Sequence, residues 1–369
     1  MHSLWPRLKA EWLLVLFALL AIALALFDPR PLTDYQRWLQ LPTLAGLTGL
    51  LIAIQGIRDS GMVQHAAAVV VARAHSVRSL GLLLVAATAL LSMVLTNDVS
   101  LFLIVPLTLA IGAMSNLPIL RMVVLEPLAV NAGSTLSPIG NPQNLLLWQH
   151  SGLPLLRFAL AMLPTSAIML AMLVVFTWCW LPRERITLSP EGIDGNVHSH
   201  RLGVGSMLAL VAMVLLMEYG HAALGAIVLL AFFALLARQS LMRIDWLLLL
   251  TFAAIFLGLG HFADLSQVRH ALDHFDFNRP LTLYLAGIFA SQVISNVPAT
   301  VLLLDRAPDA VALAIAVNVG GFGVAIGSLA NLIALRLAGQ PRGMRLLHLV
   351  SIPFLLICAP LVYLVSCFL

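Results

Sequence analysis

Charge is the property that this sequence has least of. Only 10% of its 369 residues are Asp, Glu, Lys or Arg, and Lys9 is the single lysine. Soluble domains carry about 25% charged residues, so this scarcity excludes an ordinary water-soluble enzyme. It also excludes a disordered chain, whose backbone must stay solvated. Hydrophobic residues make up 61% of the chain, and runs such as 12–27 are apolar on every face. The composition therefore predicts an all-α polytopic membrane protein.

Reactive and metal-binding side chains are also few. The three cysteines, Cys179, Cys358 and Cys367, lie in apolar stretches without a CxxC or Cys/His spacing, so neither a disulfide framework nor a zinc site is predicted. The sequence contains no HExxH, no Walker A lysine and no GxSxG. Its basic residues do not form the cluster that nucleic-acid binding needs. We therefore expect no enzyme, no nucleic-acid partner and no cofactor, with a sodium ion as the one candidate exception.

Hydropathy divides the chain into membrane crossings of roughly 20 apolar residues. Two segments do not fit a single crossing. The segment 79–120, whose only charge is Asp98, is too long for one helix, and 280–304 is interrupted near Ser295 and too short for two. The nine predicted crossings are 11–27, 38–57, 122–149, 158–181, 202–217, 222–237, 246–263, 310–335 and 346–366.

The distribution of positive charge selects the topology. If 79–120 and 280–304 are hairpins and the N-terminus is cytoplasmic, 14 of the Lys and Arg residues lie inside and six outside, as the positive-inside rule requires. Reading 280–304 as one crossing would move Arg336, Arg342 and Arg345 outside. We therefore predict an inner hairpin, an outer hairpin and a C-terminus outside. The first helix is expected to remain uncleaved, since no small-residue cleavage site follows it.

An internal repeat accounts for the two hairpins. Residues 131–145 align without gaps to 318–332, with six identities at a constant offset of 187. The sequences Leu-Thr-Asn and Ile-Ser-Asn, at 95–97 and 294–296, precede these stretches. The topology makes the two halves inverted, a pattern typical of secondary transporters with broken helices and a site near the midplane. The predicted organisation is a first repeat (1–181) with broken helix 122–149, a cytoplasmic linker (182–201), and a second repeat (202–369) with broken helix 310–335.

Short polar residues gather at the two hairpin tips and the two breaks. Such residues need partners at membrane depth, which a solute or ion can supply, and the helix starting at each tip favours an anion. The alternatives are helix N-capping for the tip residues and close helix packing for the glycines. The residues predicted to bind solute are Thr96, Asn97, Asn141, Asn144, Ser295, Asn296, Asn318 and Asn331.

A second set of residues is predicted to couple an ion to transport. Asp98 is the only acid of the inner hairpin and Val297 stands at the matching place, so an acid-dependent site would be single. A carboxyl in such a place can carry a proton or ligate sodium, and unwound carbonyls can hold a cation. Glu126, close to Arg121, is given less weight. The predicted ion-coupling residues are Asp98, Asn97, Ser134, Thr135, Ser137, Gly320 and Gly321.

Four stretches carry a resemblance to a known family. They read LTNDVSLFLIVPL (95–107), NAGSTLSPIGNPQNLLLW (131–148), SQVISNVPATVLLL (291–304) and NVGGFGVAIGSLANLIALR (318–336). The chain resembles the ion-transporter superfamily of arsenite permeases, NhaD-type sodium/proton antiporters, and citrate and dicarboxylate transporters, and most of all the bacterial YbiR-like anion transporters. The resemblance implies a scaffold, a transport part that contains both hairpins, an elevator-like step and a homodimer.

The predicted function is secondary active transport of a small anion or oxyanion-like solute across the bacterial inner membrane, driven by a proton or sodium gradient. A sodium/proton antiporter of NhaD type is the alternative. An intramembrane enzyme would need clustered acids or histidines inside the spans, and only Asp98 and Glu126 come near. A passive channel is a further alternative, which counterflow of labelled solute would exclude.

Overall fold

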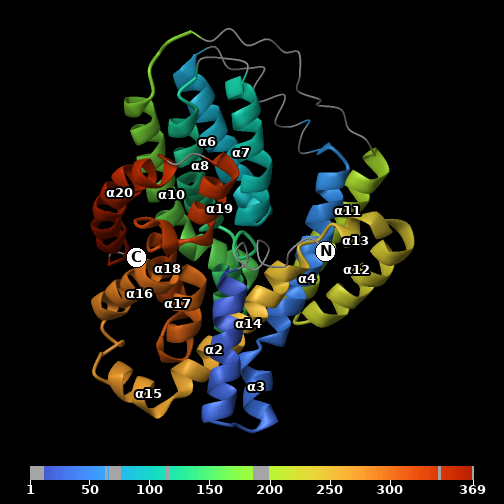
Figure 1. The fold of residues 1–369 in the computed structure, drawn as a ribbon, viewed down its shortest axis with the longest axis vertical. Helices are drawn as coiled ribbons and strands as arrows, with labels where there is room; N and C mark the ends of the chain where they lie inside the picture. Colours follow the sequence, from blue (N-terminus) through green and yellow to red (C-terminus); the bar gives the residue numbers. More distant parts are fainter. Residues whose placement is uncertain are drawn as a thin grey trace, which may run out of the picture.

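The computed structural model describes residues 12–62, 65, 76–113, 117–185, 199–339 and 342–367, without the side chains of residues 12, 13, 98, 110 and 113. Over these ranges the secondary structure is helical, and the one β-type pairing is an isolated antiparallel bridge between Ser76 and Arg185. The prediction of a polytopic helical membrane protein is confirmed at this level (Figure 1).

Six helices in the described part of the chain are long and apolar enough to cross a membrane. Five of them coincide with predicted crossings, and the sixth, at 77–94, is an arm of the predicted inner hairpin. Two more predicted crossings are shorter helices, α2 (Trp12–Phe27) and α12 (Ala222–Leu236). The six are α4 (Leu41–Asp59), α6 (Val77–Val94), α10 (Leu155–Trp180), α11 (His200–Glu218), α14 (Trp246–Asp264) and α20 (Gly343–Ser366).

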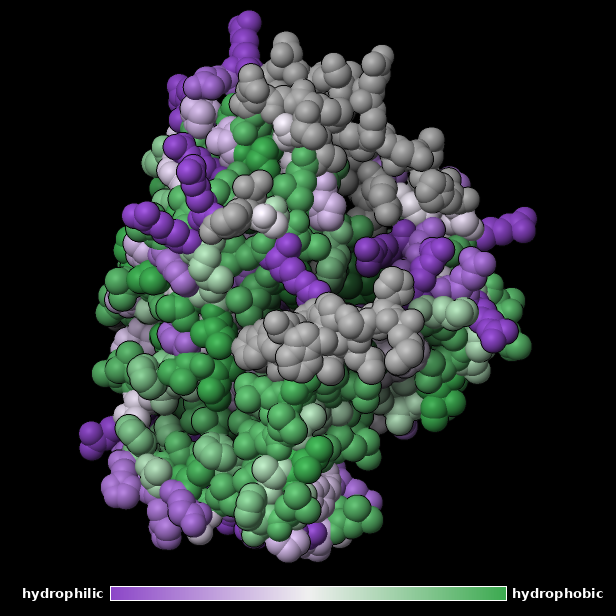
Figure 2. Space-filling model, viewed as in Figure 1, coloured by the Kyte–Doolittle hydropathy of each residue, from purple (hydrophilic) through white to green (hydrophobic). Residues whose placement is uncertain are grey.

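Large apolar side chains point outward from these helices. Leu26 is 76% exposed and Leu235 84% exposed, which water would penalise but lipid does not. Figure 2 shows hydrophobic residues over the middle of the visible face and hydrophilic ones toward its upper part and lower edge. The surface therefore matches a bilayer as solvent.

Two helix pairs occupy the places of the predicted hairpins. The first consists of α6 and α7 (Asn97–Ala113), which meet at Leu95 and Thr96. The second consists of α16 (Pro280–Ile294) and the short α17 (Asn296–Leu303), followed by a 3-10 turn, η1 (Leu304–Arg306). In Figure 1 the first pair lies in the upper part of the molecule and the second pair in the lower part.

Neither of the segments 122–149 and 310–335 is a continuous helix. The first contains α8 (Ile119–Ser134) and α9 (Pro142–Ser151). The second contains α18 (Ala310–Val319), the 3-10 turn η2 (Ala325–Gly327) and α19 (Leu329–Ala338). The interruptions are residues 135–141 and 320–328, and they are called the first break and the second break below. Each break ends in an N-cap, because Asn141 accepts from the amide of Asn144 and Ser328 from that of Ala330.

The helices pack so that the breaks lie inside the molecule. α8 packs against α6 and α7, and α18 packs against α16 and α17. Contacts also cross between the halves, since α9 lies against α18 and α17, and α19 lies against α7 and α8. On the other side, α4 packs with α11 and α12, and α14 with α2. Most residues of the two breaks are buried, and residues 136, 137, 139, 324 and 326 are half-buried.

Polar contacts at the helix ends join residues that the topology places on the same side. Arg37 and Arg269 both pair with Asp264, with α3 (Leu32–Trp38) and α15 (Ser266–Asp273) nearby. Arg306 pairs with Asp273 on that side as well. At the opposite side Arg243, just after α13 (Arg238–Met242), lies 3.2 Å from Asp59. Which of these sides is cytoplasmic stays a prediction.

Candidate functional site

Asparagine amides join the two breaks to each other. Asn141 Nδ2 donates to Asn318 Oδ1 at 3.0 Å. The same bond recurs at the offset of 187, because Ser328 Oγ donates to Asn131 Oδ1 at 3.0 Å. Each break thus provides a donor to the asparagine that stands in the opposite half.

The same offset relates the bonds that hold each break in shape. Asn144 Nδ2 lies 3.2, 3.0 and 3.2 Å from the carbonyl oxygens of Ser134, Thr135 and Ser137. Asn331 Nδ2 lies 3.0 Å from the carbonyl oxygen of Gly321 and 3.5 Å from that of Val324. The breaks interrupt the regular helical bonds of these carbonyls, although those of Ser134 and Val324 still accept from the amides of Ser137 and Gly327, and buried backbone groups must be paired. One amide in each half therefore takes the place of the missing helix bonds.

Asn144 and Asn318, both predicted to bind solute, are hydrogen-bonded to one another. Asn318 Nδ2 donates to Asn144 Oδ1 at 2.6 Å and to the carbonyl of Ala314 at 2.8 Å. The structure therefore places these two amides in the framework of the breaks. Their predicted contact with solute stays a prediction.

The tips contribute buried polar atoms that have no partner. Thr96 Oγ1, Asn97 Oδ1 and Ser295 Oγ are buried and make no hydrogen bond within the described chain, and neither does Asn331 Oδ1. Nine such side-chain atoms occur in the part of the chain that the structure describes, and four belong to predicted solute residues. Buried polar groups are nearly always hydrogen-bonded, so these atoms are free to meet a ligand.

The backbone of each tip region is anchored. The amide of Asn97 donates to the carbonyl oxygen of Gly140 at 3.0 Å, which holds the first tip on the first break. At the second tip, Asn296 Oδ1 accepts from the amide of Val297 at 3.0 Å. Ser295 has φ of 76°, a left-handed conformation that is uncommon for residues with a side chain. Strain of this kind gathers at functional sites.

Close approach explains a glycine in each half. A Cβ on Gly133 would collide with the Ala89 carbonyl of α6, and one on Gly320 would lie 2.6 Å from Ser291 Cβ of α16. These glycines, whose positions differ by 187, let a hairpin arm pack directly on a broken helix. Close helix packing, the alternative for the glycines, is thus observed at Gly320, and its role in ion coupling stays a prediction.

The predicted ion-coupling residues are distributed around the first break and the start of the second. Ser134 Oγ accepts from Asn141 Nδ2 at 3.0 Å, and Thr135 Oγ1 donates to the carbonyl of Asn131 at 2.7 Å. The carbonyl of Gly321 accepts from both Asn131 and Asn331. Asp98 is the second residue of α7, and its side chain lies outside the described part of the structure.

Three residues of this network did not enter the predicted site. They are Asn131, which accepts from Ser328, Ser328 itself, and Gln292. Gln292 Nε2 donates to the carbonyls of Gly320 and Phe322 at 2.6 and 2.9 Å. Asn131 was recoverable from the alignment, since it is the repeat partner of Asn318. Gln292 carried a weaker signal, as the amide of an otherwise apolar hairpin arm.

Four helices begin within this cluster, at Asn97, Pro142, Asn296 and Leu329. α9 packs against α17 and α18, and α19 against α7. The amide of Asn97 donates to the carbonyl of Gly140 next to the start of α9, and a Cβ on Gly321 would lie 3.3 Å from Asn296 Nδ2, so these helix starts lie beside the two breaks. A helix N-terminus carries a partial positive charge, and N-termini bind anions readily. No group of three or more His, Cys, Asp or Glu suited to a metal occurs in the described ranges. The arrangement thus favours an anionic ligand held by dipoles, hydroxyls and amides.

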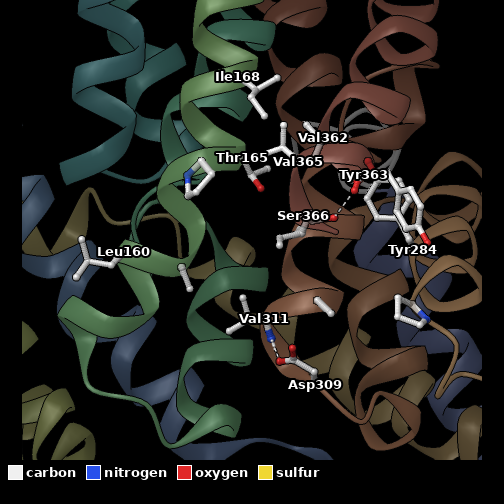
Figure 3. Close-up of a pocket in the computed structure, with 15 residues that line it drawn as sticks. Leu160, Thr165, Ile168, Tyr284, Asp309, Val311, Val362, Tyr363, Val365 and Ser366 are labelled. Atoms are coloured by element: carbon white, nitrogen blue, oxygen red, sulfur yellow. Dashed lines mark hydrogen bonds between the residues drawn. The ribbon is translucent and has the colours of Figure 1, made fainter. Parts of the chain in front are cut away.

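A separate cavity lies away from this cluster. Its volume is about 470 Å³, and it opens between α10, α16, α18 and α20 (Figure 3). Its lining includes Leu160, Ile168 and Val311 together with Thr165 and Tyr284. None of the predicted site residues is among those that line it. The cavity and the candidate site are therefore different places in the fold.

Comparison with known proteins gives a family match over most of the chain. The model of the family described as citrate transporter (CitMHS) matches residues 7–312. The inner membrane protein YbiR of Escherichia coli is 39% identical over 350 residues, which cover 95% of this chain and 94% of that protein. The uncharacterized transporter MJ0456 of Methanocaldococcus jannaschii is 30% identical, covering 87% and 86%. A silicon efflux transporter of rice, LSI3, is 26% identical over 52% of this chain and 40% of its own length.

Proposed function

Because this chain belongs to the citrate transporter family, we propose that it is a secondary active transporter of a small anionic or oxyanion-like solute. The chain is a multi-pass membrane transporter of the YbiR type and not an enzyme. By the name of its E. coli relative, we assign it to the bacterial inner membrane. A proton or sodium gradient drives it through an elevator-like step, and it works as a homodimer.

One observation carries the choice of an anion. Four helix N-termini converge on a buried cluster that holds the unpartnered hydroxyls of Thr96 and Ser295. The dipoles supply positive potential without a charged side chain, and the hydroxyls supply donors. A site of this kind attracts an anion without the desolvation that a buried arginine would require.

The acceptor oxygens of the same cluster suit a coupling cation. Asn97 Oδ1 and Asn331 Oδ1 are buried and unpartnered, and amide oxygens are ligands that hard cations such as sodium accept. Asp98, next to Asn97 in the chain, would supply the negative charge. A sodium ion bound there would lie beside the solute in the same cluster.

The test is flux into proteoliposomes that contain the purified full-length protein. Labelled citrate, arsenite and phosphate are supplied separately, with an inward sodium gradient, an inward proton gradient or no gradient. We expect one anion to accumulate with at least one gradient and to exchange with unlabelled anion in counterflow. Non-saturating entry without counterflow would identify a channel instead. In the same assay, the variant Asp98→Asn should not accumulate the anion.

A sodium/proton antiporter is the second candidate, favoured by the Asn97-Asp98 tip. An amide oxygen followed by a carboxyl can hold a cation without any anion present. Vesicles loaded with a pH-sensitive dye would then show a pH change when sodium is added in the absence of anions. No such change, together with anion counterflow, supports the first candidate.

A further inference from the structure

A buried carboxyl on α8 has no role in the cluster described above. Glu126 is fully buried. The hydroxyl of Thr108, on the second arm of the first hairpin, donates to its Oε1. Its Oε2 has no partner among the described residues.

The neighbouring helices supply no charge to compensate a carboxylate there. α8 packs against α6, α7, α10, α19 and α20, and no ion pair within the described ranges includes Glu126. Among the described side chains, no hydrogen bond joins Glu126 to another titratable group on these helices. Those groups are Arg78 on α6, Arg121 on α8, Arg157 and Cys179 on α10, Arg336 on α19, and Arg345, His348, Cys358 and Tyr363 on α20. The side chain of Asp98, on α7, lies outside the described part of the structure.

Packing does not require a carboxyl at this place. The residue at the offset of 187 is Leu313, which is also fully buried. An apolar side chain therefore fills the equivalent space in the second half. A buried acid is costly unless it has a partner, and an ionisable residue inside a membrane protein is a functional site by default.

The position of the pair connects it to the moving parts. Glu126 precedes Asn131 on α8 by five residues, about 7.5 Å along the helix, and Thr108 follows Asn97 on α7 by eleven residues, about 16 Å. The Glu126–Thr108 contact thus joins the hairpin arm to the broken helix at a distance from the tip. A shift of α7 relative to α8 would expose the carboxyl to water.

We propose that Glu126 binds the proton that couples transport, with Thr108 as its positioning residue. While α7 covers it, the group is a neutral carboxylic acid. When α7 moves away, the O–H bond breaks and the proton passes to a water molecule, leaving a carboxylate that takes up a proton again from the other side. This inference rests on the proposed function and names the proton as its driving ion.

The first experiment needs no solute. Infrared difference spectra compare wild type with Glu126→Gln, as purified full-length protein in detergent at neutral pH. We expect the wild type to show the C=O band of a protonated carboxylic acid and Glu126→Gln to lack it, while Asp98→Asn retains it. A band of equal strength in Glu126→Gln would overturn the proposal.

The second experiment uses labelled citrate as the probe in proteoliposomes. Glu126→Gln should lower uptake driven by a proton gradient by about tenfold or more, while counterflow stays within about twofold of wild type. Uptake that remains coupled to the proton gradient in this variant would overturn the inference and leave the transporter intact. If citrate is not carried by the wild type, the infrared band alone decides whether Glu126 holds a proton.

Two further variants separate coupling from folding. Glu126→Leu copies the residue of the second half and preserves an apolar packing surface, so it should fold and show the same loss of proton-driven uptake. Thr108→Val keeps the carboxyl and removes its donor. It should shift the pH profile of proton-driven uptake without abolishing it, whereas an unchanged profile would contradict the positioning role of Thr108.

Discussion

The first and second breaks form equivalent hydrogen bonds, but different residues interrupt the helix in each. The first break contains Pro138 and is followed by Pro142, whereas the second has Gly320, Gly321, Gly323 and Gly327 and no proline. Asn144 and Asn331 nevertheless bind equivalent carbonyls, and Asn141 and Ser328 bind equivalent asparagines. Both breaks therefore have the same hydrogen bonds from side-chain donors, whereas the residues that interrupt the helix, proline or glycine, differ between them.

The two halves differ more in their acidic residues than in the backbone of their breaks. Asp98 and Glu126 both belong to the first half, and Val297 and Leu313 stand at the matching places of the second. The hydroxyls and amides predicted to bind solute occur in both halves. We therefore expect solute to be held by both halves and the ion to be coupled by the first half alone, and four measurements test the differences between the halves and the rest of the fold.

The largest expected effect on stability is from Asn318→Ala. Asn318 accepts from Asn141 and donates to Asn144 and to the carbonyl of Ala314, so its loss leaves one amide hydrogen of Asn141 and the Oδ1 of Asn144 without these partners. At about 1–3 kcal/mol for each such group, this variant should lower the thermal midpoint in detergent more than Asn131→Ala. Equal losses would mean that the two asparagines are energetically equivalent.

The next effect is a steric one at the paired glycines. Gly133→Ala places a methyl group against the α6 backbone, and Gly320→Ala places one against Ser291. Overpacking of this kind costs about 1–3 kcal/mol, with the larger loss at Gly133 because backbone cannot rotate away. Gly205→Ala is the matched control, since its Cβ would meet nothing within 4 Å. A midpoint for Gly133→Ala equal to that of the control would refute the contact.

Asn97→Ala should have a small effect on stability and a large one on flux. Its Oδ1 makes no hydrogen bond within the described chain, so truncation should cost less than about 1 kcal/mol. Anion counterflow should nevertheless fall, by a rise in KM or a drop in rate. Asn144→Ala is the contrasting variant, expected to lose stability and flux together. Undiminished counterflow in Asn97→Ala would remove this residue from the site.

The smallest effect is expected at a polar pair outside both breaks. The hydrogen bond from Arg30, at 2.7–2.9 Å, holds the pKa of Asp28 below its ordinary value of 3.8. A carboxyl with a lowered pKa stabilises the fold above its unfolded pKa and loses that contribution as the pH falls through its folded pKa. Arg30→Gln should therefore lower the midpoint slightly at neutral pH, and the difference from wild type should vanish in acid. A difference that grew in acid would contradict this assignment.

Composition and the repeat made the helical class and the places of the breaks predictable. Identities at a constant offset pointed to Asn144, Asn318 and Asn331, and the aligned stretch also contains Asn141, opposite Ser328. Their partners were not predictable, because which amide donates to which carbonyl depends on how two distant segments pack. The geometry shows Asn144 and Asn318 bonded to each other, a relation that neither local sequence contains.

The surroundings of Glu126 could not be predicted from the sequence either. Its nearness to Arg121 in the chain favoured an interfacial position, but five residues on a helix place the two more than one turn apart. The carboxyl is fully buried among the helices that pack against α8, and Thr108 of α7 donates to it. Sequence spacing alone does not contain that packing, so the burial of Glu126 could not be predicted from it.

The hydrogen bonds between the two breaks also bear on the order of synthesis. Residues 131–144 leave the ribosome well before 318–331, so Asn131 and Asn141 enter the membrane without the partners that they have in the finished protein. Until the later segment is inserted, those amides must form hydrogen bonds with water or with the insertion machinery. The first break therefore reaches its final hydrogen bonding only after the second half has been inserted. Truncated chains that end in the linker should be recognised by quality-control proteases.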